Sequence, residues 1–229
     1  MVLGWLYLLN ASILAALAWL LQGRGQAGRG PSGWFQVWLW LGVATNILLF
    51  ASRAIPDETI SLSFWLAGYS SVTLLLLFLL MFVRSFAGGS GFRDIFFTLP
   101  ALFSISLVLL GGGSFSLREE GVWRFDLSCR ASLLPRTVMV LYALAALAWL
   151  VVLYVNVREG GSETAERGVR ILLWALVIMF LTNAASPFIR EYLSPQLPVG
   201  EAGFTLGSLL IALDLSWMKA WKSGKRASP

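Results

Sequence analysis

Residues 63–83 read SFWLAGYSSVTLLLLFLLMFV, a stretch of 21 residues without a charged side chain. A helix of about 20 apolar residues crosses the roughly 30 Å hydrocarbon layer of a bilayer. Six further apolar stretches lie on either side of it, and each is expected to be helical because lipid offers no partner to backbone N–H and C=O groups. The sequence therefore predicts an all-α integral membrane protein with a seven-helix domain over residues 1–221. The predicted helices cover approximately residues 2–21, 34–52, 63–83, 95–110, 137–157, 169–189 and 202–217.

The composition excludes several classes of protein. Of the 229 residues, 58% are hydrophobic and only 13% are charged, and none is histidine. Without histidine the chain has no His-ligated metal or haem, no Ser-His-Asp triad and no phosphoaccepting histidine. We therefore expect no enzyme, no metal site and no cofactor, although a bound lipid or pigment stays open. Cys129, the single cysteine, is either a lone thiol or half of an intermolecular disulfide.

The basic residues predict how the chain is oriented. They lie in short loops beside apolar runs, which argues for membrane topology rather than nucleic-acid binding. Eleven fall on one side and six on the other, so the side with eleven is expected to be cytoplasmic, with the amino terminus outside and the carboxyl terminus inside. The predicted location is the cell membrane, as a multi-pass protein of the bacterial cytoplasmic membrane. Residues 222–229 form a basic cytoplasmic tail. Four basic residues in or beside it would bind lipid headgroups or a partner, or only set the topology: Lys219, Lys222, Lys225 and Arg226.

The longest predicted loop, residues 111–136 between the fourth and fifth helices, has its own pattern. Trp123, Phe125 and Leu127 alternate with Arg124 and Asp126 after a Glu-Glu-Gly turn. Such alternation predicts a short β-hairpin on the outer side. The hairpin would be an amphipathic cap packed on the helix ends, or else a ligand lid or docking surface.

Polar residues within the apolar stretches share one depth. At 1.5 Å per residue, Asn10, Asn46, Tyr69 and Asn183 each lie on the order of 10 Å below the outer end of their helices. Two explanations compete: hydrogen bonds between packed helices, or an outward-opening pocket for a small or lipid-like ligand. The candidate ligand-binding residues are Asn10, Asn46, Trp65, Tyr69, Ser70, Asn183, Ser186, Thr205 and Ser208.

Two charges are predicted within or at the edge of the membrane. Asp214 is the one carboxylate inside an apolar run, which is costly unless it is paired, protonated or hydrated. It would form an ion pair or anchor, for which Arg84 at the inner end of the third helix is the candidate partner, or act as a proton- or ion-sensitive switch. A lone carboxylate has no acid-base partner in the sequence, so a catalytic role is not predicted.

A set of residues along the chain carries a resemblance to a known family: Phe64-Trp65, Tyr69, Phe78, Phe82, Arg84, Gly121-Val122-Trp123, Glu166-Arg167, Arg170 and Asn183. With these residues the layout resembles the amino-terminal seven-helix membrane region of bacterial sensor histidine kinases. The resemblance covers most of the chain and implies a signal-receiving membrane module with this orientation. The kinase domain and phosphoacceptor that follow in that family are absent from this sequence, so a signal would pass to a separate protein.

Three functions remain open from the sequence. The first is a non-catalytic, receptor-like or sensory module that signals to a separate cytoplasmic output protein. The second is an accessory or structural subunit of a larger membrane complex, in which lipid-facing aromatics such as Trp38, Phe50 and Phe78 would contact other membrane proteins. The third is a small transporter. The lipid bilayer is a partner in all three, and nucleic acid is a partner in none.

Overall fold

The chain folds into a helical bundle with the makeup of a multi-pass membrane protein. The computed structural model describes residues 5–23, 31–86, 93–110, 114–119, 122–127, 129–160, 163–192 and 197–213. Five helices are long and apolar enough to cross a membrane, and α4 and α7 contain shorter apolar segments. The elements of this part of the chain are α1 (Trp5–Gly23), α2 (Pro31–Ala54), α3 (Glu58–Phe86), α4 (Arg93–Leu110), β1 (Ser114–Glu119), β2 (Val122–Leu127), α5 (Cys129–Gly160), α6 (Glu163–Tyr192) and α7 (Val199–Leu213).

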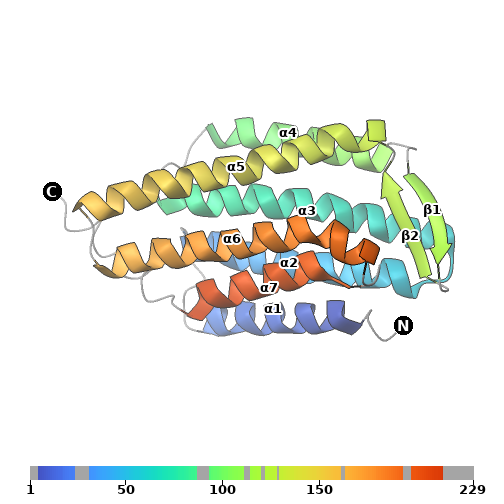
Figure 1. The fold of residues 1–229 in the computed structure, drawn as a ribbon, viewed down its shortest axis with the longest axis horizontal. Coiled ribbons are helices and arrows are strands. Elements are labelled where there is room, and N and C mark those ends of the chain that lie inside the picture. The colour runs from blue at the N-terminus through green and yellow to red at the C-terminus, as the bar shows by residue number, and fades with distance from the viewer. Residues whose placement is uncertain are drawn as a thin grey trace.

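The helices lie side by side along the long axis of the molecule, and consecutive helices run in opposite directions (Figure 1). α1 packs against α2 and α7, while α3 packs against α2, α4 and α5. α6 packs against α5 and α7. The two strands pair antiparallel, from Ser114 opposite Leu127 to Glu119 opposite Val122, and lie at one end of the bundle, called the hairpin end below (Figure 1).

The turn between α2 and α3 fixes these two helices against each other. Asp57 caps α3, because its Oδ1 atom accepts a hydrogen bond of 2.8 Å from the backbone N–H of Ile60. The hydroxyl of Ser61 in the first turn of α3 donates to the carbonyl of Ser52 near the end of α2. Deeper in the bundle the hydroxyl oxygens of Thr45 and Ser71 lie 2.8 Å apart. Polar contacts therefore join α2 and α3 at two levels.

The strand pair is attached to this turn by aromatic side chains. The indole Nε1–H of Trp123 on β2 donates to the carbonyl oxygen of Pro56 at 2.8 Å. Phe125, two residues along, is buried, and its ring centroid lies 5.9 Å from that of Trp65 on α3. β2 therefore presents these two aromatic residues to the ends of α2 and α3, as expected for side chains that alternate along a strand.

An aromatic cluster forms the core toward the opposite end of the bundle. Phe35 and Trp38 on α2 are buried with ring centroids 5.6 Å apart. Phe35 also stacks on Phe82 of α3 at 5.4 Å, and Trp38 meets Phe204 of α7 edge on at 4.6 Å. Trp38 is 1% exposed, so the prediction that it faces lipid and contacts other proteins is wrong. Phe78, also predicted to face lipid, is half-buried.

Glycine residues let α7 approach α6 closely. A Cβ atom at Gly203 would lie 1.8 Å from Oγ1 of Thr182 and 2.5 Å from its Cβ, and one at Gly207 would lie 2.3 Å from Cε of Met179. Small residues at such contacts are typical of helix packing in membranes, where van der Waals contact rather than the hydrophobic effect holds helices together. The face of α7 that carries these glycines is buried against α6.

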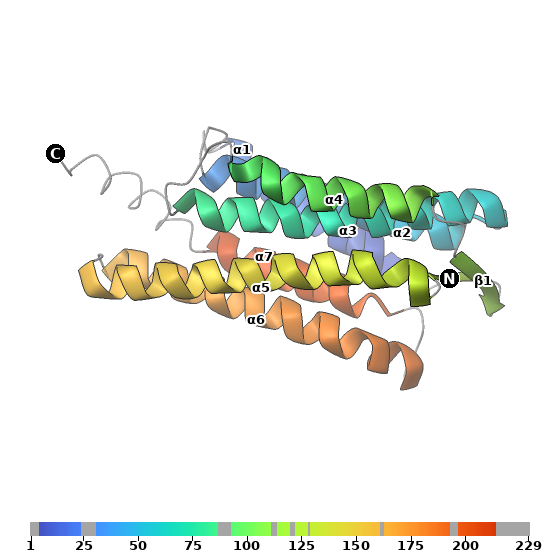
Figure 2. The same ribbon diagram turned by 90° about the horizontal axis from the view of Figure 1, so that it is seen from above.

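α5 and α6 are the longest helices and extend beyond the others. They contain 32 and 30 residues, and at the end opposite the hairpin they project past the remaining helices in both views (Figures 1 and 2). α5 begins at Cys129 and includes Pro135, so residues 129–136 are helical rather than part of the predicted loop. Pro135 is the seventh residue of α5, beyond the first turn, so its missing N–H removes one backbone hydrogen bond from the helix.

Apolar side chains cover much of the outer surface of the bundle. Trp174 is 62% exposed and Leu110 is 84% exposed, and similar residues occur on the other helices. In water such a surface would drive aggregation, whereas in a bilayer it contacts acyl chains. The surface and the buried aromatic core together agree with the membrane character of the chain.

Candidate ligand pocket

A partly open pocket of about 500 Å³ lies between α2, α3, α5, α6 and α7. This volume lies in the range typical of small-molecule sites, about 300 to 1,000 Å³. The described residues that line it are Trp38, Thr45, Asn46, Val72, Leu75, Leu76, Leu79, Met139, Val140, Ala143, Leu144, Leu176, Met179, Phe180, Asn183, Ala184, Gly200, Glu201 and Phe204.

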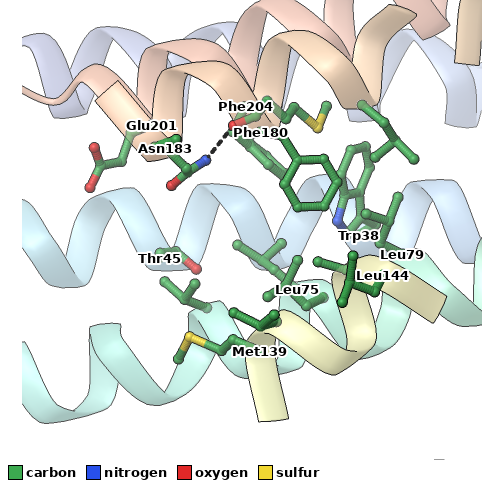
Figure 3. A pocket seen from close by; sticks show the side chains of 18 of the residues that line it. Trp38, Thr45, Leu75, Leu79, Met139, Leu144, Phe180, Asn183, Glu201 and Phe204 are labelled. Carbon is green, nitrogen blue, oxygen red and sulfur yellow. Dashed lines mark hydrogen bonds between the residues drawn. The ribbon is translucent and has the colours of Figure 1, made fainter. Parts of the chain in front are cut away.

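The polar lining residues gather at one end of the pocket. Figure 3 shows Thr45, Asn183 and Glu201 at one end and Trp38, Leu79 and Leu144 at the other. Because α2 runs toward the hairpin end, Thr45 lies nearer that end than Trp38, by about 10 Å at 1.5 Å per residue. The few polar lining residues therefore lie toward the hairpin end of a largely apolar pocket.

Asn46, next to Thr45 on α2, has an unsatisfied acceptor. Its side chain is 2% exposed, and its Nδ2 atom donates to the carbonyl of Gly42 at 2.9 Å. Its Oδ1 atom has no hydrogen-bond partner among the described residues. Burying a polar atom without a partner costs free energy, and because the atom is fully buried, a molecule in the pocket does not contact it in this arrangement.

The other polar side chains at this end already interact with groups inside the bundle. The Thr45 hydroxyl donates to the carbonyl of Leu41 or to Ser71, each at 2.8 Å. Nδ2 of Asn183 donates to the carbonyl of Met179 at 2.8 Å. Glu201 lies in the first turn of α7, where a carboxylate is favoured by the positive end of the helix dipole.

Large side chains line the apolar end of the pocket. Trp38 and Phe204 form its inner wall through their edge-to-face contact, and Leu79 and Leu144 line it from α3 and α5. Leu144 is also 56% exposed, so this end is not closed on the side of α5. At the hairpin end α5 and α6, which both contribute lining residues, diverge from one another in both views (Figures 1 and 2).

The structure brings two of the predicted ligand residues to the pocket, Asn46 and Asn183. Asn10 is buried on α1, which contributes no described lining residue. The rings of Trp65 and Tyr69 lie 5.5 Å apart, and Trp65 also contacts Phe125 of the strand pair. The four remaining candidates are buried but line no part of the pocket: Ser70, Ser186, Thr205 and Ser208.

Some of these polar residues act in helix packing, which was the competing explanation. Ser71, beside Ser70, bonds to Thr45 across the α2–α3 interface. Thr205 and Ser208 donate to backbone carbonyls four residues earlier in α7, those of Glu201 and Phe204. Of these hydrogen bonds, the one between Thr45 and Ser71 joins two helices, whereas those of Thr205 and Ser208 stay within α7.

The predicted intramembrane arginine, Arg84, is buried at the end opposite the hairpin. It is 6% exposed, and its guanidinium carbon lies 4.7 Å from the ring centroid of Phe97 on α4 and 6.0 Å from that of Trp149 on α5. Such cation–π contacts stabilise a desolvated guanidinium. Arg84 therefore joins three helices at this end.

Several sequence-based predictions fall outside the described residues. Asp214, proposed as a partner of Arg84, follows the last described residue of α7. The same holds for the basic residues Lys219, Lys222, Lys225 and Arg226.

Sequence reasoning did not identify Thr45, Glu201 or Phe204 as pocket residues. Thr45 lies beside Asn46, so the shared depth of the polar residues would have included it. Glu201 precedes the start predicted for the last helix, at 202, and the structure begins α7 at Val199. Phe204 is one of many aromatic residues, and nothing in the sequence marks it.

The described lining residues of the pocket are mostly apolar. Glu201 is the one carboxylate among them, and no group of three or more His, Cys, Asp or Glu in the described ranges could hold a metal ion. No protein-family model matches the chain, and comparisons with curated proteins and with solved structures give no match either.

Proposed function

We propose that the chain is a non-catalytic, receptor-like membrane module that binds a lipophilic ligand and signals to a separate protein. The observation that carries this proposal is the pocket of about 500 Å³, which is largely apolar and has a few polar lining residues toward the hairpin end.

We infer that all seven helices cross the bilayer, with the amino terminus outside and the carboxyl terminus in the bacterial cytoplasm. The antiparallel order of the helices and the apolar segments of α4 and α7 support seven crossings. The larger number of basic residues on one side supports this orientation. The strand pair then lies outside the cell, at the same end as the polar part of the pocket.

The projecting ends of α5 and α6 are the proposed route for the signal. Both helices line the pocket near the hairpin and extend beyond the bundle at the opposite end, which the proposal places in the cytoplasm. The projecting part is polar, with an exposed contact of 2.7 Å between Arg170 and Glu166. A ligand that moves α5 relative to α6 would shift this surface and a partner bound to it.

Filling the pocket tests whether it holds a ligand. Ala143 lines the pocket on α5, whereas Ala148 lies on the exposed face of the same helix. We expect the full chain, extracted with its membrane into nanodiscs, to carry a lipophilic molecule detectable by native mass spectrometry. Ala143→Phe should lose that molecule, and Ala148→Phe should keep it.

A second variant that fills the pocket distinguishes loss of binding from a folding defect. Ala184→Phe enlarges an exposed lining residue of α6 and does not overpack the core as Ala143→Phe does. Loss of the molecule from both filling variants, with thermal unfolding close to that of the Ala148→Phe control, supports the proposal. If both filling variants carry the same molecules as the control, the pocket is not the binding site and the accessory-subunit function is favoured.

The signalling part of the proposal has its own test. Spin labels at Leu134→Cys on α5 and Phe188→Cys on α6, in a Cys129→Ser background, report the separation of these helices near the pocket. We expect the distance distribution measured by electron paramagnetic resonance to differ between the parent chain, which carries the molecule, and the Ala184→Phe variant, which does not. An unchanged distribution would contradict signalling through α5 and α6.

A further inference from the structure

The exposed lining residues of the pocket belong to two helices. Val140 and Leu144 on α5 are 55% and 56% exposed, and Asn183 and Ala184 on α6 are exposed as well. The described lining residues of α2 and α3, in contrast, are all buried or half-buried. α5 and α6 also diverge toward the hairpin end (Figures 1 and 2). The open side of the pocket therefore lies at α5 and α6.

This open side is at the depth of the acyl chains. Val140 and Leu144 belong to the apolar segment Leu133–Glu159 of α5, and Asn183 and Ala184 belong to the apolar segment of α6. At 1.5 Å per residue, Val140 and Leu144 lie about 10 Å and 16 Å from the hairpin end of their segment. Both depths fall within a hydrocarbon layer roughly 30 Å thick. A molecule that enters here comes from the bilayer and not from water.

The shape and lining of the pocket suit a single hydrocarbon chain. The lining residues extend from Trp38 to Asn46 on α2 and from Val72 to Leu79 on α3, so the pocket follows the helices for about 10 Å. Acyl chains extend across a leaflet in the same direction as helices that cross the bilayer. A largely apolar space offers water few polar partners. A volume of about 500 Å³ is typical of a site for one small molecule, so a phospholipid with two chains and a headgroup does not fit inside as a whole.

Resting on the proposed function, we propose that the ligand is a phospholipid of the outer leaflet that inserts one acyl chain between α5 and α6 into the pocket. The headgroup stays at the interface on the hairpin side, and the chain runs past Thr45 toward Trp38 (Figure 3). The second chain stays in the bilayer. Because lipid is itself apolar, van der Waals packing in the pocket and the high concentration of lipid around it favour this binding. The module then responds to the lipid composition of the outer leaflet.

Photo-crosslinking tests where the chain lies. Val72 and Leu76 are half-buried lining residues one turn apart on α3, with Val72 nearer the hairpin end. The full chain is placed in nanodiscs with a small fraction of phosphatidylcholine that carries a diazirine in one acyl chain. A diazirine near the ester should label Val72 more than Leu76, and one near the methyl end should label Leu76 more than Val72. The reverse order would place the headgroup at the other leaflet, and absence of both labels would exclude the chain from the pocket. Either result overturns the proposal.

The filling variants show whether this labelling requires the pocket. Ala143→Phe and Ala184→Phe should abolish labelling at the two α3 positions, and Ala148→Phe should keep it. Labelling of Leu102 on α4, which is 57% exposed, should be the same in every variant because it reports general contact with lipid. Leu80 on α3 is fully buried, and its labelling would reveal a folding defect. If Ala143→Phe has that defect, Ala184→Phe decides, and unchanged labelling of the two α3 positions in it overturns the proposal.

A probe with one chain separates this inference from the proposed function. It is a fatty alcohol with the same diazirine-bearing chain. If the alcohol labels Val72 and Leu76 and the phospholipid labels only exposed residues such as Leu102, the pocket takes a free lipophilic molecule. That result overturns the phospholipid assignment and leaves the proposed function standing. If neither probe labels the two α3 positions, and native mass spectrometry finds the same molecules on the filling variants as on Ala148→Phe, both proposals fall. Labelling by both probes supports the proposal, since a phospholipid chain then enters the pocket.

Discussion

The hydroxyl oxygens of Thr45 on α2 and Ser71 on α3 lie 2.8 Å apart in the buried interior of the bundle. Thr45 also lines the pocket, so this contact joins the wall of the pocket to the packing of two helices. Hydrogen bonds between helices in a membrane contribute on average about 0.6 kcal/mol and up to about 2 kcal/mol.

A double-mutant cycle should detect this contact. Thr45→Val and Ser71→Ala should each destabilise the protein, with a coupling energy of about 0.5 to 2 kcal/mol in reversible unfolding in mixed micelles. Thr73→Val is the matched control, because the buried Oγ1 atom of Thr73 has no hydrogen-bond partner among the described residues. That control should be neutral or stabilising. A zero coupling energy would show that the contact does not contribute.

Gly203→Ala should separate α6 from α7. A new Cβ would meet Oγ1 and Cβ of Thr182, which belong to a short branched side chain that cannot move away. We expect a loss of about 1 to 3 kcal/mol in unfolding free energy, typical of overpacking. Gly207→Ala should cost less, because its nearest contact is the mobile end of Met179. Adding Thr182→Ala to Gly203→Ala should restore part of the loss, and absence of this rescue would contradict the close approach.

Trp123→Phe should loosen the strand pair without unfolding the bundle. The change keeps an aromatic ring but removes the N–H that donates to the carbonyl of Pro56. A hydrogen bond of this kind contributes about 0.5 to 1.5 kcal/mol. Limited proteolysis should therefore cut residues 114–127 faster, while the midpoint of unfolding changes little. Trp19→Phe, at an exposed position on α1, should leave the cleavage rate as it is.

The order of sites along the chain could be predicted, but the rotation of each helix could not. Hydropathy identifies the apolar stretches because a bilayer has a fixed thickness, and counting residues gives the depth of a side chain within it. Asn46 and Asn183 share a depth and also line the pocket. Asn10 and Tyr69 share the same depth but lie elsewhere, because in this sequence every face of a membrane helix is apolar and no face is marked as buried.

The ends of the helices could not be predicted from the sequence either. α5 begins eight residues before its predicted start. The polar and charged residues near Cys129 have the composition of a loop, although they form the first turns of the helix. α7 includes Glu201 for the same reason. Both extensions lie at the hairpin end, which is why the polar end of the pocket was only partly predicted.

Arg84→Met should destabilise the bundle far more than Arg158→Met. Both arginines lie near the same end, but Arg84 is buried against Phe97 and Trp149, whereas Arg158 is exposed. Methionine keeps the length of the side chain and removes the charge, so the loss reports the cation–π contacts and the other interactions of the guanidinium, about 2 kcal/mol or more. Equal thermal stability of the two variants would contradict a structural role for Arg84.

The apolar segments of the helices differ in length, with 27 residues in α5 and 18 in α1. At 1.5 Å per residue these lengths are about 40 Å and 27 Å, so an acyl layer of one thickness cannot match both helices in the same upright posture. α5 must lean further than α1, or the lipid around it must stretch. Because α5 also lines the pocket, a change in acyl-chain length would act on one wall of the pocket, and the thickness of the surrounding lipid would influence the protein alongside any dissolved molecule.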